Sequence, residues 1–413
     1  MRPLLRRFPA LTHADFAWLW AAGTASSIAL WTLILGNAWV VFKLSDSSSL
    51  VGVATFASLF PFLLSPIGGV VADRFERLHI LKITRAGAVL TTAVILALAI
   101  AGVLEPWIVI AVALAQGLVR SGEMPAEQAL IPNVVARNEI ANAIMLSTTS
   151  RLGSRAIGPL LAGPLLATVG VAGAYGIALA FAVLAFVLLF RVGARSHGGV
   201  SDIRRAPAGL GEGLRYVREN QGVLAVFALV VAHCTLTMSF DALLPGFAER
   251  NLGTPTNGYT VLSAAVGAGA FLGALALVLS ADRGRGVLFL TTGIVSGFAP
   301  VLLAISGTLP AGALGAAAMG GSQAMFMALA AVFIQESVDD AFRGRVMSLY
   351  LMSAGGLMAF ANLGSGALAD VYGAPAMLIV PGGAFIAIIL GSLLIAPNLR
   401  RVYAAGVIPR LPA

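Results

Sequence analysis

The stretch GGVVADRFERLHILKITRAG, from Gly68 to Gly87, places acidic and basic side chains between two long apolar segments. Apolar runs of about 20 residues recur along all 413 residues. A helix of about 20 apolar residues is long enough to cross the hydrocarbon core of a bilayer. Charged residues make up only 11% of the chain and hydrophobic residues 59%, whereas soluble domains carry about 25% charged residues. The composition therefore predicts an all-α membrane protein with many spans.

We predict twelve transmembrane helices in two groups of six. The first six lie near 16–42, 50–72, 80–104, 107–128, 140–168 and 171–192, and the last six near 222–246, 257–281, 287–307, 310–335, 346–369 and 374–396. The longest polar connector, 193–221, is rich in Gly, Ser and Arg and is expected to be a linker. The chain then divides into an N-terminal six-helix bundle (1–192), the linker, and a C-terminal six-helix bundle (222–413).

The placement of Lys and Arg predicts the orientation of these spans, because cytoplasmic loops carry the excess of basic residues. With the N-terminus inside, the basic residues of the outer loops are Lys43 and Arg250. Both termini and the linker are therefore expected to be cytoplasmic. The net charge of +8 then reflects topology, and we expect no nucleic-acid partner. The single cysteine, Cys234, excludes a disulfide within the chain.

Two pairs of segments indicate an internal repeat. Ala-Asp-Arg follows the second span at Asp73 and the eighth span at Asp282, 209 residues later. The segments IPNVVARNEIANAIM (131–145) and IQESVDDAFRGRVMS (334–348) are offset by 203 residues, and at this offset Gly163 matches Gly366. A duplication of six helices is thus expected to give two pseudo-symmetric bundles, with a solute site between them near the midplane.

The loop after span two resembles the signature loop of the major facilitator superfamily. Its pattern Gly-x-x-x-Asp-Arg-x-x-Arg comprises Gly69, Asp73, Arg74 and Arg77, and the degenerate copy after span eight contributes Asp282 and Arg283. The resemblance implies the major facilitator fold and a loop that acts as a conformational latch. The alternative is a simple basic loop on the inner side. The segments 127–163 and 342–356 are similar to the bacterial branch of enterobactin and macrolide exporters.

An export motif is also present in imperfect form. Gly158, Pro159 and Gly163 resemble the antiporter motif of proton-driven exporters, although Ala162 and Ser154 stand where glycines are expected. The arginine that many such exporters carry in span four would fall near position 113, which is an alanine here. The resemblance therefore favours export more firmly than it favours proton coupling.

Span four carries a polar stripe. Its members, Gln116, Arg120, Glu123 and Glu127, follow one another at intervals of four, three and four residues, which places them on one helix face. Such a face is costly in lipid and is expected to contact protein or a water-filled cavity. We predict that at least one of the two glutamates pairs with the arginines of the signature loop. Local pairing of Arg120 with Glu123 is the alternative.

Span seven carries His233, Thr237 and Asp241 at intervals of four. An acid within the membrane is a candidate for taking and releasing protons, and His233 is a second candidate. The alternatives are an interfacial Asp241 that caps a helix and a neutral, packed His233. In span five, Arg151 and Arg155 form either an anion-attracting patch or a clamp between helices. Asn37, Gln323 and Asn362 either contact the solute or join helices.

The chain lacks a phosphate-binding Gly-x-x-x-x-Gly-Lys-Ser/Thr motif, a Gly-x-Ser-x-Gly nucleophile elbow and a cluster of metal-ligand residues. We therefore expect no cofactor, no metal and no enzymatic activity. The sequence predicts a monomeric secondary active transporter of the bacterial inner membrane, which exports a small amphipathic or hydrophobic solute with proton coupling. An importer or a facilitator for lysolipids or metabolites is the alternative, and a non-transporting receptor is a more distant one.

Overall fold

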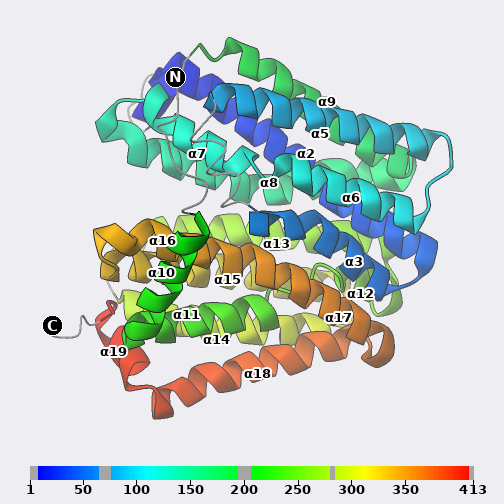
Figure 1. Cartoon of the computed structure of the whole chain (residues 1–413). Helices are drawn as coiled ribbons and strands as arrows, with labels where there is room; N and C mark the ends of the chain where they lie inside the picture. Colours follow the sequence, from blue (N-terminus) through cyan, green and yellow to red (C-terminus); the bar gives the residue numbers. More distant parts are fainter. Residues whose placement is uncertain (1–7, 65–75, 194–205, 280–283, 409–413) are drawn as a thin grey trace.

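The structure is a computed structural model that describes residues 8–64, 76–193, 206–279 and 284–408. Within these ranges nearly every residue is helical and no strand forms. The long helices run side by side along one axis (Figure 1). The first described residues, α10 (Ala206–Glu219) and α19 (Pro397–Ala405) lie at one end of the molecule. We call this end the α10 end and the opposite end the distal end.

The first half of the chain supplies one group of helices and the second half another. The first group is α2 (Ala14–Ser45), α3 (Ser48–Leu59), η2 (Phe60–Leu64), α5 (Arg77–Ile100), α6 (Pro106–Arg120), α7 (Glu123–Val134), α8 (Ile140–Thr168) and α9 (Val171–Leu188), with the short turns η1 (Pro9–Thr12), η3 (Arg137–Glu139) and η4 (Leu189–Arg191). The second group is α11 (Gln221–Leu236), α12 (Leu244–Arg250), α13 (Pro255–Leu279), α14 (Arg285–Ala304), α15 (Leu309–Ser337), α16 (Asp340–Met352), η6 (Ser353–Leu357), α17 (Met358–Tyr372), α18 (Ala374–Ile395) and α19.

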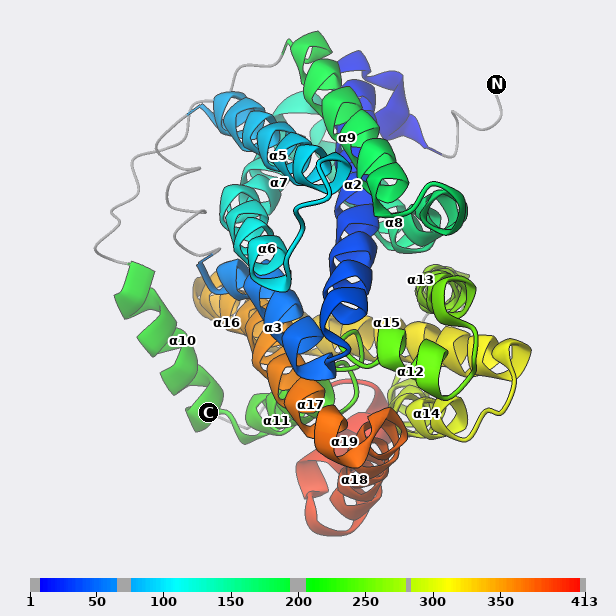
Figure 2. The same cartoon turned by 90° about the vertical axis from the view of Figure 1, so that its right-hand side faces the viewer.

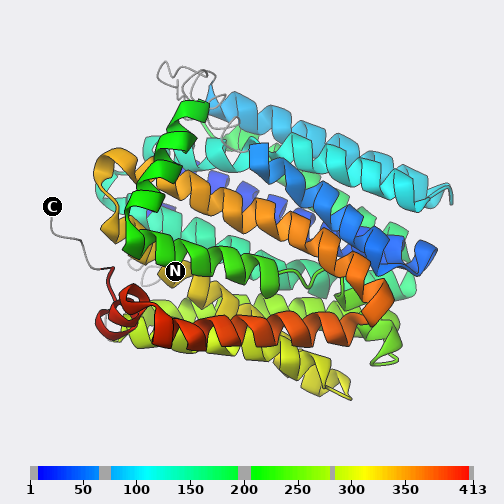
Figure 3. The same ribbon diagram turned by 60° about the horizontal axis from the view of Figure 1, so that its bottom comes forward.

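The structure confirms a many-span helical membrane protein. In the described part of the chain, nine helices are long and apolar enough to cross a bilayer, and the bent pair Gly211–Glu219 and Gln221–Leu236 raises the number to ten. The short α3 and the arginine-bearing α8 are not among them. Nevertheless α3 runs beside α17 (Figure 3), and α8 packs against α2 and α13. The count of twelve spans stays a prediction.

Two of the predicted transmembrane helices are each broken into two shorter helices. The predicted helix 222–246 is wrong, because α11 ends at Leu236 and a turn separates it from α12. Asp241 therefore lies in a turn and not on a helical stripe with His233. The predicted helix 107–128 is interrupted at Ser121 and Gly122, so α6 and α7 each supply half of the polar stripe.

The turns reflect the internal repeat. Gly170 precedes α9 with φ +79°, and Gly373 precedes α18 with φ +84°. These glycines are 203 positions apart, and both adopt a backbone conformation that only glycine reaches without strain. The matched positions of the two sequence halves thus form matched turns.

The most extensive contacts between the two groups of helices are those of α8 with α13 and of α3 with α17, and η2 also touches η6. Figure 2 shows both pairs at the boundary between the groups. Gly163 packs against Thr260 in the first pair, and Gly366 packs against the backbone of Ser48 in the second. These are the glycines that the repeat aligns. One buried apolar cluster includes side chains from both groups, among them Phe42 and Phe247.

The predicted linker contains α10, which packs on α16 of the second group. Tyr216 stacks on Phe342 with ring centroids 4.8 Å apart, and Arg345 Nη1 lies 2.6 Å from Glu212 Oε2. These contacts attach the linker helix to the second half of the chain.

Candidate functional site

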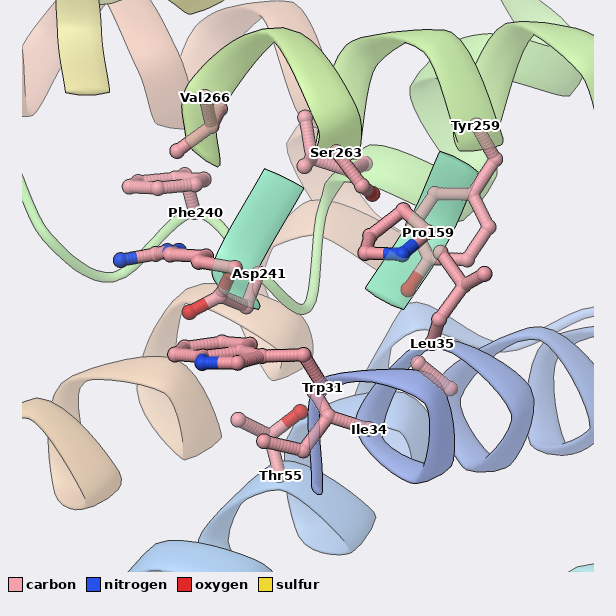
Figure 4. A pocket seen from close by; sticks show the side chains of 13 residues that line it. Trp31, Ile34, Leu35, Thr55, Pro159, Phe240, Asp241, Tyr259, Ser263 and Val266 are labelled. Carbon is pink, nitrogen blue, oxygen red and sulfur yellow. The ribbon is translucent and has the colours of Figure 1, made fainter. Parts of the chain in front are cut away.

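An ion pair joins the two halves at a point between the α10 end and the distal end. Arg155 of α8 places Nη2 3.4 Å from Oδ1 of Asp241, which lies in the turn before α12. The guanidinium is 4.6 Å from the ring centroid of Trp31 and 5.7 Å from that of Phe240. Figure 4 shows Asp241 between these two rings. Contacts to aromatic faces and to an acid hold this arginine in a defined position.

Both halves contribute to a cavity of about 30 Å³ around this pair. Besides the pair and its aromatic neighbours, the wall includes Thr55, Pro159, Tyr259 and Ser263 (Figure 4). Tyr259 also stacks on Trp39 with ring centroids 5.9 Å apart. The ion pair is therefore part of a mixed polar and aromatic lining rather than of a lipid-facing surface.

A larger cavity, of about 110 Å³, lies in the first half. Most of the surface area of its wall is apolar and includes side chains of α2 and α6 such as Leu30, Leu33 and Ala113. Its polar lining residues are Ser26, Ser27, Asn37, Ser58, Gln116, Arg120, Glu123, Glu127 and Arg151. All four members of the predicted span-four stripe line this cavity, although α6 and α7 are separate helices. The expectation that the stripe faces a cavity is therefore met.

Arg85 of α5 holds the two glutamates of this wall. Its Nη2 lies 3.1 Å from Glu123 Oε1 and 3.2 Å from Glu127 Oε2, and its Nη1 donates to the carbonyl oxygen of Ala22. The Arg85 side chain is only 1% exposed. An arginine removed from water in this way needs such partners, because an unpaired buried charge is costly.

Two further arginines complete this group. Arg120 Nη1 lies 3.5 Å from Glu123 Oε2 and donates to Ser26 Oγ at 3.1 Å, and Arg151 Nη1 lies 3.9 Å from Glu127 Oε1. We call Arg85, Arg120, Glu123, Glu127 and Arg151 the charged cluster. The local pair between Arg120 and Glu123 is present, as the alternative interpretation predicts.

A third cavity, of about 20 Å³, adjoins both of the others. It shares Trp31 and Asp241 with the cavity at the ion pair, and it shares Asn37 and Ser58 with the cavity in the first half. Ile34 lines all three. The three cavities are therefore neighbours between the ion pair and the charged cluster, and we call them together the passage.

Asn37 belongs to a hydrogen-bonded chain in the wall of this passage. Its Nδ2 donates to Gln116 Oε1 at 3.3 Å, and its Oδ1 accepts from Tyr175 at 3.0 Å. The three side chains join α2, α6 and α9. Asn37 therefore joins helices and also lines the passage.

Gln323 and Asn362 support the turn that carries Asp241. Gln323 Nε2 donates to the carbonyl oxygen of Thr237 at 2.8 Å, and Asn362 Oδ1 accepts from the backbone nitrogen of Ala242 at 3.2 Å. Ser365 Oγ donates to the carbonyl oxygen of Ser239 at 2.7 Å. Irregular backbone at membrane depth requires such partners. The three side chains thus fix the turn from α15 and α17.

His233 lies away from the passage, in the core of the second half. Its Nε2 is 2.7 Å from Ser296 Oγ, and its ring stacks on Phe326 with centroids 4.5 Å apart. It is fully buried, and it lines none of the three cavities of the passage. This is the packed arrangement that the alternative interpretation predicts.

The glycines of the antiporter-like motif lie at close helix contacts. A side chain at Gly158 would meet the backbone of Thr32 on α2, and one at Gly163 would meet Thr260 on α13. Pro159 lines the cavity at the ion pair. The motif therefore allows α8 to pack closely against both α2 and α13.

Most of the signature loop lies outside the described residues, namely Gly69, Asp73 and Arg74, and so do Asp282 and Arg283 of its second copy. Arg77 is described. It begins α5, and its Nη1 donates to the carbonyl oxygen of Ala129 at 2.8 Å and to Asn133 Oδ1 at 3.2 Å. Arg77 thus ties α5 to α7 at the α10 end. The described partners of the two glutamates of α7 are the arginines of the charged cluster and Ser26, whose Oγ donates to Glu123 Oε1 at 2.7 Å.

Several residues of the site do not belong to any of the predicted polar stripes or motifs. Arg85 is not among the residues that the sequence patterns select, although it lies eight positions after the first residue of the 24-residue helix α5. An arginine that far into an apolar helix is a signal for an internal partner. Nothing in the sequence marks Trp31 and Tyr259 as residues of a site, because aromatic residues are common in apolar helices.

At the distal end, polar contacts join the halves. Arg250 Nη2 lies 2.7 Å from Asp46 Oδ1, and Lys43 Nζ lies 2.8 Å from Glu249 Oε1. Asp370 of α17 accepts from the α3 N-terminus in the opposite half. Among the described residues, the side-chain hydrogen bonds between the halves lie at this end or at the Arg155–Asp241 pair.

The comparisons with known proteins identify the family. The family model described as transmembrane secretion effector, which is of the major facilitator type, matches residues 6–412. Macrolide efflux protein A of Streptococcus pyogenes is 26% identical over 354 residues, with 81% of this chain and 84% of the relative covered. The enterobactin exporter EntS of Shigella boydii is 27% identical over 360 residues, with 82% and 81% covered.

Solved structures support the same fold. A peptide transporter of the POT type in complex with alafosfalin superposes with a TM-score of 0.76 at 13% identity, covering 94% of this chain and 95% of that one. A POT family transporter in complex with a thioalcohol-conjugated peptide gives 0.74 at 12% identity, covering 93% and 96%. At these identities the likeness concerns the fold alone. Together with the match along nearly the whole sequence, it establishes that the chain belongs to the transmembrane secretion effector family of the major facilitator superfamily and is a membrane transporter rather than an enzyme.

Proposed function

We propose that the protein is a proton-coupled exporter of a small amphipathic or hydrophobic solute, working by alternating access between a bundle of residues 1–192 and a bundle of residues 222–413. Two relatives that cover most of the chain are named for efflux and export. The protein would reside in a bacterial plasma membrane as a monomer, with the α10 end and both termini in the cytoplasm.

The distribution of contacts between the halves supports a cytoplasm-facing state. Polar contacts and a shared apolar cluster close the distal end, and the passage lies between that end and the charged cluster. To release solute outside, the distal contacts must break while new contacts form at the α10 end.

The Arg155–Asp241 ion pair is the observation that carries the proposal. It bridges the halves and lines the passage, so its formation and loss are coupled to their separation. Protonation of Asp241 removes the charge that attracts Arg155. A proton on Asp241 would therefore favour separation of the two halves at this point, which links proton binding to the access change.

The experiment is transport by purified protein in proteoliposomes under an imposed pH gradient. Labelled erythromycin and enterobactin serve as probes, because two relatives are named for macrolide efflux and enterobactin export. Wild type should move one of them faster with the gradient than without it, and Asp241→Asn should abolish this difference. Glu105→Gln, an exposed acid before α6, is the matched control and should behave as wild type. Gradient-driven transport by Asp241→Asn would contradict the coupling role.

The signature loop is proposed to act as the latch that stabilises the outward-facing state. Its residues Gly69, Asp73, Arg74 and Arg77 sit at the N-terminus of α5 or precede it. Asp73→Asn should slow turnover more than it weakens solute binding, because binding uses the passage and turnover uses the conformational change. Equal turnover in Asp73→Asn and wild type would argue against a latch.

A further inference from the structure

The charged cluster has more positive than negative charge. Arg85, Arg120 and Arg151 contribute three guanidinium groups, and Glu123 and Glu127 contribute two carboxylates. Arg85 makes the closest contacts to both glutamates, at 3.1 and 3.2 Å. The two remaining arginines share acids that Arg85 already binds. Within the described residues, the cluster therefore lacks one negative charge.

Arg120 has two buried nitrogens without a hydrogen-bond partner among the described residues. A guanidinium has five N–H groups, and at Arg120 the described contacts all involve Nη1. Its Nε and Nη2 are buried and have no hydrogen-bond partner among the described residues. The side chain is 8% exposed. A buried donor without a partner costs about 1–3 kcal/mol, and more when the group is charged.

Gln116 lies one turn away on the same face of α6. Its Oε1 accepts from Asn37, whereas its Nε2 is buried and has no partner within the described part of the chain. Gln116 and Arg120 both line the 110 Å³ cavity. Incompletely paired donors on adjacent turns beside a cavity are the arrangement expected where a ligand supplies the acceptor.

The other walls of this cavity define the rest of the ligand. Leu30, Leu33 and Ile34 of α2 and Ala113 of α6 are apolar. A ligand with an acidic group near Arg120 would place a hydrocarbon body against these side chains. Its charge would also balance the cluster.

We infer that the first-half cavity is a binding subsite for amphipathic organic acids, in which Arg120 and Gln116 donate to the carboxylate. This inference rests on the proposed function in one respect, that the passage carries a small solute. It concerns the class of solute and makes no use of proton coupling.

The test is equilibrium binding to the full-length protein in detergent, with no gradient. The probes are 4-phenylbutyrate, 4-phenylbutyramide and 4-phenylbutylamine, which share one apolar body and differ in the charge of the head group. Each is titrated by isothermal calorimetry and by the shift in melting temperature. The acid should bind at least about tenfold more tightly than the amide, the ratio expected for one charge-assisted hydrogen bond. Equal binding of the three probes, tighter binding of the amine, or no binding of the acid at millimolar concentration would overturn the inference.

Three variants separate recognition from folding. Arg120→Gln should reduce the preference for acid over amide to about one, since no charge-assisted bond remains, while Arg120→Lys should keep part of it. Arg215→Gln removes the same charge from the exposed surface of α10 and should leave the preference unchanged. If Arg120→Gln keeps the full preference, the subsite assignment is wrong. Gradient-driven transport that persists in Asp241→Asn would contradict the coupling proposal and would leave this binding result unaffected, so the two proposals fail separately.

Discussion

The carboxylate of Asp370, on α17, accepts hydrogen bonds from the backbone nitrogens of Ser48 at 2.7 Å and Ser49 at 2.9 Å, at the first turn of α3. The same carboxylate accepts from Ser47 Oγ at 2.7 Å. An acid of one half therefore caps a helix of the other, where the helix dipole and free N–H groups favour a negative charge. Separation of the two halves at the distal end would break this contact.

Replacing Asp370 by Asn should shift the protein towards the state that is open at the distal end. The amide loses the charge that strengthens these hydrogen bonds, and each charge-assisted bond contributes about 1.5–3 kcal/mol. The population of the open state should rise by about tenfold or more. Spin labels at Val103 and Ile305, which are exposed in distal loops of the two halves, would report this as a longer distance in pulsed electron resonance.

Glu105→Gln is the matched control for this measurement, because it neutralises a distal acid that caps no helix with its side chain. The distance distribution in this variant should equal that of wild type. If Asp370→Asn also leaves the distribution unchanged, Asp370 does not hold the distal end closed.

The Arg155–Asp241 pair should show strong coupling in a double-mutant cycle. Each single alanine substitution leaves a mostly buried charge without its partner, at a cost of about 3–5 kcal/mol. The double variant removes both charges and should lose less stability than the two single variants together. Thermal unfolding of the purified variants measures the difference. Additive effects would mean that the two side chains do not stabilise each other.

Arg85→Met should destabilise the protein far more than Arg151→Met. Arg85 is 1% exposed and bridges both glutamates at about 3 Å, so its loss leaves two buried carboxylates close together, at a cost of about 3–5 kcal/mol. Arg151 is 28% exposed and lies 3.9 Å from Glu127, so its loss should cost about 1 kcal/mol or less. Melting temperatures of the two variants test this order, and a reversed order would contradict the central position of Arg85.

Gly267→Ala should weaken the contact between α13 and α8. A methyl group there would clash with the backbone nitrogen of Ala156, and the backbone cannot move aside as a flexible side chain does. Overpacking of this kind costs about 1–3 kcal/mol. Gly176→Ala on α9 is the control, since nothing lies within 4 Å of a methyl group there. We expect a lower melting temperature for the first variant and an unchanged or higher one for the second.

The internal repeat illustrates what a pattern in the sequence is able to predict. Gly163 and Gly366 were aligned by their spacing, and both lie where α8 and α17 touch the opposite half. The polar stripe of span four faces a cavity as expected. The reason is that charged side chains are costly in lipid, so the helix turns this face towards the protein interior. The helical break at Ser121 and Gly122 is not predicted by the sequence, because the spacing of four polar residues stays helical across a turn of two residues.

The sequence by itself determined the class of the protein and its many spans, because apolar run length and basic loops respond directly to the bilayer. Its superfamily was indicated by the resemblance of the loop after span two to a known signature. The tertiary structure alone decided which polar residues act together. It paired Asp241 with Arg155, 86 positions away, and placed His233 in a separate core. It also put Arg85 at the centre of the charged cluster. The physical reason is that a charge within the membrane is tolerated only beside a partner, and the partner is chosen by the packing of helices distant in sequence.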